Sequence, residues 1–91
     1  MEEPMIRSRG QAVLRQIADE YVLIPTGEMA LQVQKLICLT ESSAMLWKML
    51  AQGTTEQAMW QALLDTYEVD EATARKDTAE FLENMKALGL L

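Results

Sequence analysis

The chain has 91 residues, of which 49% are hydrophobic and 24% are charged, and it carries a formal net charge of −6. This composition is typical of one small globular domain and excludes a disordered chain. The single cysteine and the lack of histidine exclude a disulfide framework, an ordinary zinc cluster and histidine-based catalysis. No apolar run reaches the ~18 residues that a membrane span requires. We therefore expect a cytoplasmic protein that has no cofactor and no membrane partner.

The first part of the chain reads as an arm followed by a β-hairpin. Residues 1–10 lack periodicity and are expected to form a flexible N-terminal arm, which precedes a single domain over residues 11–91. The segment "AVLRQIA" alternates between two faces, and the segment "YVLIP" is a β-branched and aromatic run. A turn at Asp19–Glu20 separates them, so the two segments are expected to pair as a hairpin.

A third strand is expected over about residues 34–39, after a loop at residues 26–33 that begins with Gly27. Exposed edge strands are usually blunted by charge or proline. Here only Lys35 and Glu41 flank an apolar run. The free edge of this strand could pair with another chain, and the alternative is that the run is simply a core strand.

Three helices with clear punctuation follow the strands. The expected helices run from a Thr40 cap to about Gln52, from a Thr54 cap to about Tyr67, and from an Asp70 cap to about Leu88. Thr54 and Gln57 have the spacing of a capping box. Gly53 and Gly89 follow the first and third helices, where a left-handed residue commonly ends a helix.

The order of three strands and three helices predicts an α+β domain of the winged helix-turn-helix kind, with a three-stranded antiparallel sheet covered by helices. The third helix carries an apolar stripe at three- and four-residue steps, which is expected to face the core. Its members are Ala74, Thr78, Phe81, Met85 and Leu88.

Two segments carry a family resemblance. The strand-to-helix junction "LTESSAMLWKML" at residues 39–50 and the end "DTYEVDEATARKDTAEFLENMKALGLL" at residues 65–91 resemble PqqD-like proteins. The match covers about residues 12–91. The resemblance implies a recognition element for ribosomally synthesised, modified peptides (RiPPs), which binds the leader segment of a precursor peptide and presents the peptide to a modifying enzyme such as a radical SAM enzyme. The leader would add to the sheet as an extra strand.

The resemblance also implies where the leader binds, along the edge of the third strand and in the cleft between that strand and the third helix. The strand residues are Gln34, Lys35, Leu36, Ile37, Cys38 and Leu39. On the third helix, a second stripe with an apolar middle and basic ends is expected to face the cleft and to suit a leader with leucines and acids. This stripe consists of Arg75, Ala79, Leu82 and Lys86. The alternative is that it forms a solvated face with salt bridges.

Other functions have weaker support in the sequence. A DNA-binding winged helix is one alternative, but residues 41–91 carry four basic and nine acidic side chains, whereas nucleic acid binding relies on basic residues. An acyl or peptidyl carrier with a prosthetic group on Ser42 or Ser43 is another, but the strand-rich first half argues against it. No catalytic constellation, metal cluster or phosphate loop is present in the sequence. The open edge also permits a homodimer.

Overall fold

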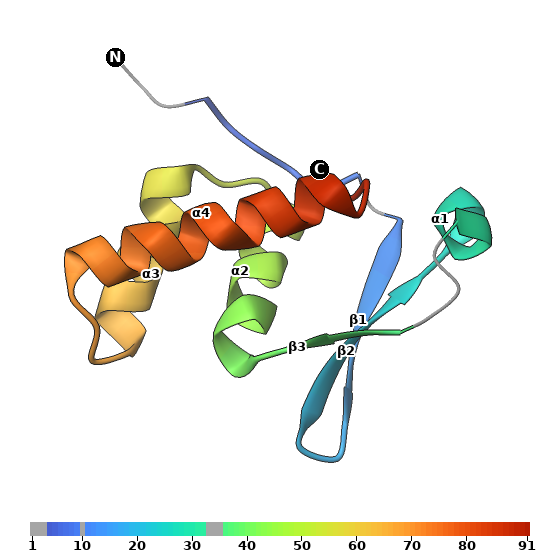
Figure 1. The fold of residues 1–91 in the computed structure, drawn as a ribbon, viewed down its shortest axis with the longest axis horizontal. Helices are drawn as coiled ribbons and strands as arrows, with labels where there is room; N and C mark the ends of the chain where they lie inside the picture. The colour runs from blue at the N-terminus through green and yellow to red at the C-terminus, as the bar shows by residue number, and fades with distance from the viewer. Residues whose placement is uncertain (1–3, 10, 33–35) are drawn as a thin grey trace.

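The computed structural model describes residues 4–9, 11–32 and 36–91 of the chain. Within them, the elements in order are β1 (Ala12–Ile17), β2 (Glu20–Pro25), α1 (Gly27–Gln32), β3 (Ile37–Leu39), α2 (Glu41–Gln52), α3 (Glu56–Thr66) and α4 (Glu71–Ala87). The strands form one antiparallel sheet in the order β1-β2-β3. The predicted α+β architecture is confirmed: the sheet lies beside a group of three helices, and β3 leads directly into α2 (Figure 1).

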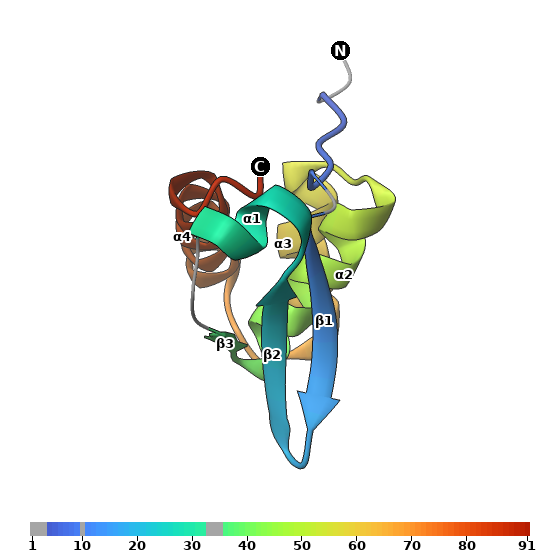
Figure 2. The same cartoon turned by 90° about the vertical axis from the view of Figure 1, so that its right-hand side faces the viewer.

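The hairpin β1–β2 has the alternation that the sequence predicts. Leu14 pairs with Leu23, and Leu23 pairs in turn with Ile37 of β3, so these three side chains share the face of the sheet that meets the helices. Leu23 is fully buried there, whereas Val13 and Ile17 of β1 are exposed on the other face. The turn end of the hairpin projects beyond α2, α3 and α4, which lie behind the sheet in Figure 2.

The segment expected to be a loop at residues 26–33 contains a short helix, so that prediction is wrong for α1. The N–H of Ala30 donates to the carbonyl oxygen of Thr26 at 3.3 Å, which closes its first turn. The residues after Gly27 are Glu, Met, Ala, Leu and Gln, all of which are good helix formers. The predicted third strand is described from Leu36 onward, and its earlier residues, Gln34 and Lys35, lie outside the described residues.

The predicted caps of α2 and α4 are confirmed. The Thr40 hydroxyl oxygen accepts from the N–H of Ser43 at 3.2 Å, and Oδ1 of Asp70 accepts from the N–H of Thr73 at 2.8 Å. These bonds satisfy amides that a helix leaves unpaired in its first turn. Gly53 and Gly89 have φ values of 93° and 80°, in the left-handed region that glycine adopts without a Cβ clash.

The predicted cap of α3 is wrong by one residue. Thr54 is buried and pairs with Ile6 of the N-terminal arm, through an Ile6 N–H to Thr54 carbonyl bond of 2.6 Å and its 2.8 Å reciprocal. The backbone of Thr54 is therefore extended, and Thr55 becomes the cap by accepting from the N–H of Ala58 at 3.1 Å. The described part of the arm is also bonded at Arg9, whose N–H donates to the carbonyl oxygen of Leu90 at 3.0 Å.

The hydrophobic core lies between the three long helices and the inner face of the sheet. Leu23 supplies the contact from the sheet and Leu90 closes the core at the C-terminal end, and both are fully buried. The predicted inner stripe of α4 is confirmed, because Ala74, Thr78, Phe81 and Met85 are buried. None of the described helices is long and apolar enough to cross a membrane.

We predict that the Asp70 cap makes the stability of the domain depend on pH. Hydrogen bonds from the side chain and the N–H of Thr73 lower the pKa of Asp70 below its ordinary value of 3.8. A group whose pKa is lower in the folded state stabilises the fold above its unfolded pKa and loses this contribution as pH falls through its folded pKa. Asp70→Asn keeps a capping oxygen but does not titrate. The difference in Tm between wild type and Asp70→Asn should therefore move against the wild type below about pH 4. A constant difference from pH 7 to pH 2 would contradict this role.

Candidate functional site

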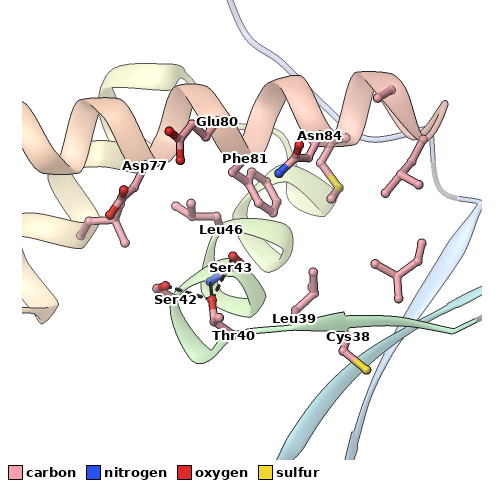
Figure 3. Close-up of a pocket in the computed structure, with 15 residues that line it drawn as sticks. Cys38, Leu39, Thr40, Ser42, Ser43, Leu46, Asp77, Glu80, Phe81 and Asn84 are labelled. Carbon is pink, nitrogen blue, oxygen red and sulfur yellow. Dashed lines mark hydrogen bonds between the residues drawn. The ribbon is translucent and has the colours of Figure 1, made fainter.

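A cleft of about 630 Å³ opens between β3 and α4, with the start of α2 at one end (Figure 3). It follows the free edge of the sheet, and four elements line it. The lining residues are Ile37, Cys38 and Leu39 of β3, Thr40 before α2, Ser42, Ser43 and Leu46 of α2, Leu63 of α3, and Asp77, Glu80, Phe81, Asn84, Met85, Ala87 and Leu88 of α4 and its cap.

The floor of the cleft is apolar and is continuous with the core. Leu46, Phe81 and Met85 are buried core residues that also line the cleft. Ile37 and Leu39 pack against this core from β3 and are half-buried. Apolar side chains of a bound molecule would therefore contact a surface held rigid by packing from beneath, which favours preorganised binding.

The end of the cleft near α2 is polar. The Thr40 hydroxyl donates to Oγ of Ser43 at 3.0 Å and lies 3.2 Å from Oγ of Ser42. Across from these hydroxyl groups, α4 presents the side chains of Asp77 and Glu80 toward the cleft (Figure 3). The ion pairs found among the described residues are Arg75–Glu71 and Lys86–Glu83. The carboxylates of Asp77 and Glu80 take part in neither pair.

The backbone pairing of β3 follows from the register of the hairpin. In a two-residue hairpin the residues beside the turn, here Ile17 and Glu20, form a hydrogen-bonded pair. Hydrogen-bonded pairs recur at every second residue along an antiparallel ladder. The 2.8 Å bond from the N–H of Thr26 to the carbonyl oxygen of Gln11 agrees, because Thr26 is even-numbered like Glu20. The even-numbered residues of β2 therefore bond to β1.

It follows that the odd-numbered residues of β2 bond to β3. Tyr21 pairs with Leu39 and Leu23 pairs with Ile37, so the backbone groups of Ile37 and Leu39 are used within the sheet. Cys38 lies between them, and its N–H and C=O point away from β2 toward the open edge. Its thiol lies on the exposed face of the sheet. The site thus combines a free strand edge with an adjacent half-apolar cleft.

The structure brings three of the predicted strand residues to the cleft. Ile37, Cys38 and Leu39 line it, whereas Leu36 is 55% exposed and precedes β3. Gln34 and Lys35 lie outside the described residues, and a binding role for them stays a prediction.

The stripe predicted on the third helix does not line the cleft. Leu82 is only 8% exposed and belongs to the hydrophobic core. Arg75 lies over the ring of Trp60, 4.5 Å from its centre, and pairs with Glu71 at 3.2 Å. Lys86 is 4.0 Å from Glu83, an exposed ion pair of the kind that the alternative interpretation, a solvated face, implies. Ala79 is exposed and is also not among the lining residues.

The face of α4 that lines the cleft is the border of its core stripe. Phe81, Met85 and Leu88 belong to both, and Asp77, Glu80 and Asn84 flank them at three- and four-residue steps. These three polar residues were not predicted, because the prediction used a second stripe along the opposite margin of the core stripe, where Leu82 is buried. A helix that covers the edge of a sheet borders the adjoining cleft with one margin of its buried stripe. The helical period of α4 shows two such margins and does not show which of them faces β3.

Comparison with known proteins gives a family match and two similar structures. The family described as Coenzyme PQQ synthesis protein D (PqqD) matches residues 20–91. The structure titled "TbiB1 in Complex with the TbiA(beta) Leader Peptide" is 26% identical with a TM-score of 0.75, and the alignment covers 94% of each chain. The structure titled "Lasso peptide synthetase B1 complexed with the leader peptide" is 23% identical with a TM-score of 0.73, and covers 92% of this chain and 93% of that one. No curated protein sequence matches the chain.

The burial of Leu82 leads to a stability prediction. Leu82→Ala should lower the free energy of unfolding by about 2–5 kcal/mol, because it removes buried methyl groups and leaves a cavity. Urea denaturation followed by tryptophan fluorescence measures this change. Ala79→Gln, one turn away on the exposed side, is the control and should change stability by no more than about 0.5 kcal/mol. A Leu82→Ala protein as stable as the control would place Leu82 outside the core.

Proposed function

The chain belongs to the PqqD family, and we propose that it binds the leader segment of a ribosomally synthesised precursor peptide and presents that peptide to a modifying enzyme. Both similar structures bear titles that name a bound leader peptide, and both match this chain over more than nine-tenths of its length. The observation that carries the proposal is the Cys38 backbone, which faces the open edge beside the cleft. Main-chain pairing at such an edge contributes affinity, and the cleft contributes side-chain contacts that give specificity.

The leader would add as a fourth strand beside β3. Its backbone would exchange hydrogen bonds with Cys38, and every second side chain would point toward the floor formed by Leu46, Phe81 and Met85. A guest strand rises about 3.3 Å per residue. Since β3 has only three residues, roughly two or three guest residues pair directly with it. The cleft must therefore provide much of the affinity through apolar anchors.

We assign the protein a binding role and no catalytic step of its own. PqqD-like proteins are recognition partners, and the side chains of the cleft suit contact with a peptide better than bond making. The modifying enzyme is a separate partner, for which a radical SAM enzyme is one candidate class. A leader-binding role also implies a location in the cytoplasm, where precursor peptides are synthesised. A homodimer formed through β3 would compete with the leader, because both need the same Cys38 edge.

The first test removes the donor at the edge. Cys38→Pro deletes the N–H that points away from β2 and should raise the Kd for the leader by roughly tenfold or more, since a main-chain hydrogen bond is lost and its partner is left unpaired. The β2 ladder should survive, because that N–H takes no part in it and edge strands tolerate proline. The leader peptide for the titration is the one encoded by the short precursor gene nearest to this gene, labelled for fluorescence anisotropy.

Cys38→Val is the matched control. It also removes the thiol but keeps the N–H, so its Kd should stay close to that of the wild type. Equal affinities for Cys38→Pro and Cys38→Val would rule out main-chain pairing at this position. Circular dichroism of both variants shows whether the sheet is retained.

Hydrogen exchange provides an independent test of the same edge. On leader binding, exchange at the Cys38 amide should slow, whereas Ile37 and Leu39 are already bonded to β2 and should change much less. Two-dimensional NMR of labelled protein measures all three. Slowing at Ile37 and Leu39 with none at Cys38 would show that the strand has the reverse parity, with Cys38 bonded to β2 and its neighbours facing the guest.

A further inference from the structure

A second, smaller hollow of about 300 Å³ adjoins the cleft beyond its polar end. Its lining residues are Thr40, Glu41, Ser42, Leu63, Tyr67, Val69 and Asp77. Thr40, Ser42, Leu63 and Asp77 also line the main cleft. The two hollows therefore adjoin each other, and Asp77 lies at their border, where a strand bound along β3 would pass beside both.

The smaller hollow has apolar walls and acidic edges. Leu63 is buried, and Tyr67 and Val69 are half-buried, so their side chains form the walls. Glu41 and Asp77 are both exposed. Glu41 and Tyr67 line the same hollow, and the pKa of the Tyr67 hydroxyl is raised first by burial and further by the negative charge of Glu41. No basic side chain lines either hollow among the described residues.

Two opposite electrostatic effects meet at this place. The start of α2 carries the positive end of a helix dipole, equivalent to about half an elementary charge, and would favour an anion. Against it stand the full negative charges of Glu41, Asp77 and, one turn along α4, Glu80. The three carboxylates outweigh the dipole several-fold. Lys48, further along α2, lies over the Tyr21 ring at 5.7 Å and lines neither hollow.

We propose that the smaller hollow is a subsite for a lysine or arginine side chain of the bound leader, and this proposal rests on the leader-binding function. Long basic side chains combine an apolar stem with a charged head. The stem would contact Leu63, Tyr67 and Val69, and the head would lie beside Asp77 and Glu41. The sequence analysis expected a leader with acidic residues, whereas this proposal requires a basic one. The earlier expectation depended on Arg75 and Lys86 lying at the cleft.

The geometry of α4 gives the spacing within the leader. Asp77 and Met85 mark the acidic and apolar ends of the cleft, and eight residues of helix separate them by about 12 Å. An extended guest covers this distance in roughly four residues. Since alternate side chains share a face, the basic residue and two apolar anchors would occupy positions i, i+2 and i+4.

The direction of the sheet gives their order. Pairing between neighbouring strands is antiparallel throughout, and β3 runs from Ile37 toward Thr40, which lies at the acidic end of the cleft (Figure 3). An antiparallel guest runs the other way, so its N-terminal part meets Asp77 first. The expected pattern is a basic residue followed by apolar residues two and four positions later.

The test uses three synthetic fluorescein-labelled peptides with the sequence Thr-Thr-X-Thr-Leu-Thr-Leu-Thr-Thr, in which X is lysine, glutamine or glutamate. Anisotropy titrations of the wild-type protein should give the lowest Kd for lysine and the highest for glutamate. We expect a difference of about tenfold between these two, as for a partly shielded charge pair. Asp77→Asn should reduce the difference, and Asp77→Lys should reduce it further, because only Glu41 and Glu80 then remain to attract the basic side chain.

Glu83→Lys is the matched control, because it makes the same change in net charge on an exposed residue of α4 that lines neither hollow. It should keep the preference for lysine and thereby separate a local effect from a long-range one. Amide shifts at β3 distinguish the two possible failures. If all three peptides shift β3 signals and bind equally, the basic subsite is overturned while strand addition stands. If neither these peptides nor the encoded leader perturbs β3, the leader-binding function itself is overturned.

Discussion

The register of the β1–β2 hairpin is the constraint on which the rest of the site depends. A two-residue turn at Ala18 and Asp19 joins the strands, and Ala18 takes a φ of 57°, which is unfavourable for a residue with a Cβ. This tight turn fixes which residues of β2 bond to β1 and which bond to β3. A slip of one residue would turn Leu23 out of the core and would exchange the free and paired amides of β3. The core and the binding edge are thus set by the same turn.

The cleft owes its rigidity to residues that it shares with the core. Phe81 and Met85 pack beneath it, and α4, which carries both, is fixed at its two ends by the Asp70 cap and by Gly89. A binding surface built on a packed helix loses little conformational entropy when a ligand arrives. The short β3 strand fits this arrangement, because a guest gains few backbone bonds from three residues and must be recognised mainly by its side chains.

Local signals predicted most of the fold because they act over a few residues. Thr40 and Asp70 cap their helices through bonds to amides three positions ahead, and the stripe through Phe81 and Met85 follows the helical period. The failures required information from distant residues. Thr55 and not Thr54 caps α3, because Ile6, which is distant in sequence, pairs with the backbone of Thr54.

The face of α4 that borders the cleft was not readable from α4 alone. Whether Leu82 or Asn84 lies beside the guest depends on where β3 crosses the helix, and the helical period does not contain that position. The strand side was different. The family resemblance placed the guest along the third strand, and its residues Ile37 to Leu39 do line the cleft, whereas their binding role stays a prediction.

An open edge beside acidic side chains also distinguishes between partners. A second copy of this chain that approached this edge with its own β3 would bring no basic side chain to Asp77 and Glu80, because none lines the cleft among the described residues. The net charge of −6 adds a general repulsion between copies. The same carboxylates attract a peptide that has a basic residue at the matching position. In other sheets, edge lysines or prolines discourage self-pairing, and here the acidic border of the cleft has that effect. It leaves the Cys38 edge available to a guest of the opposite charge.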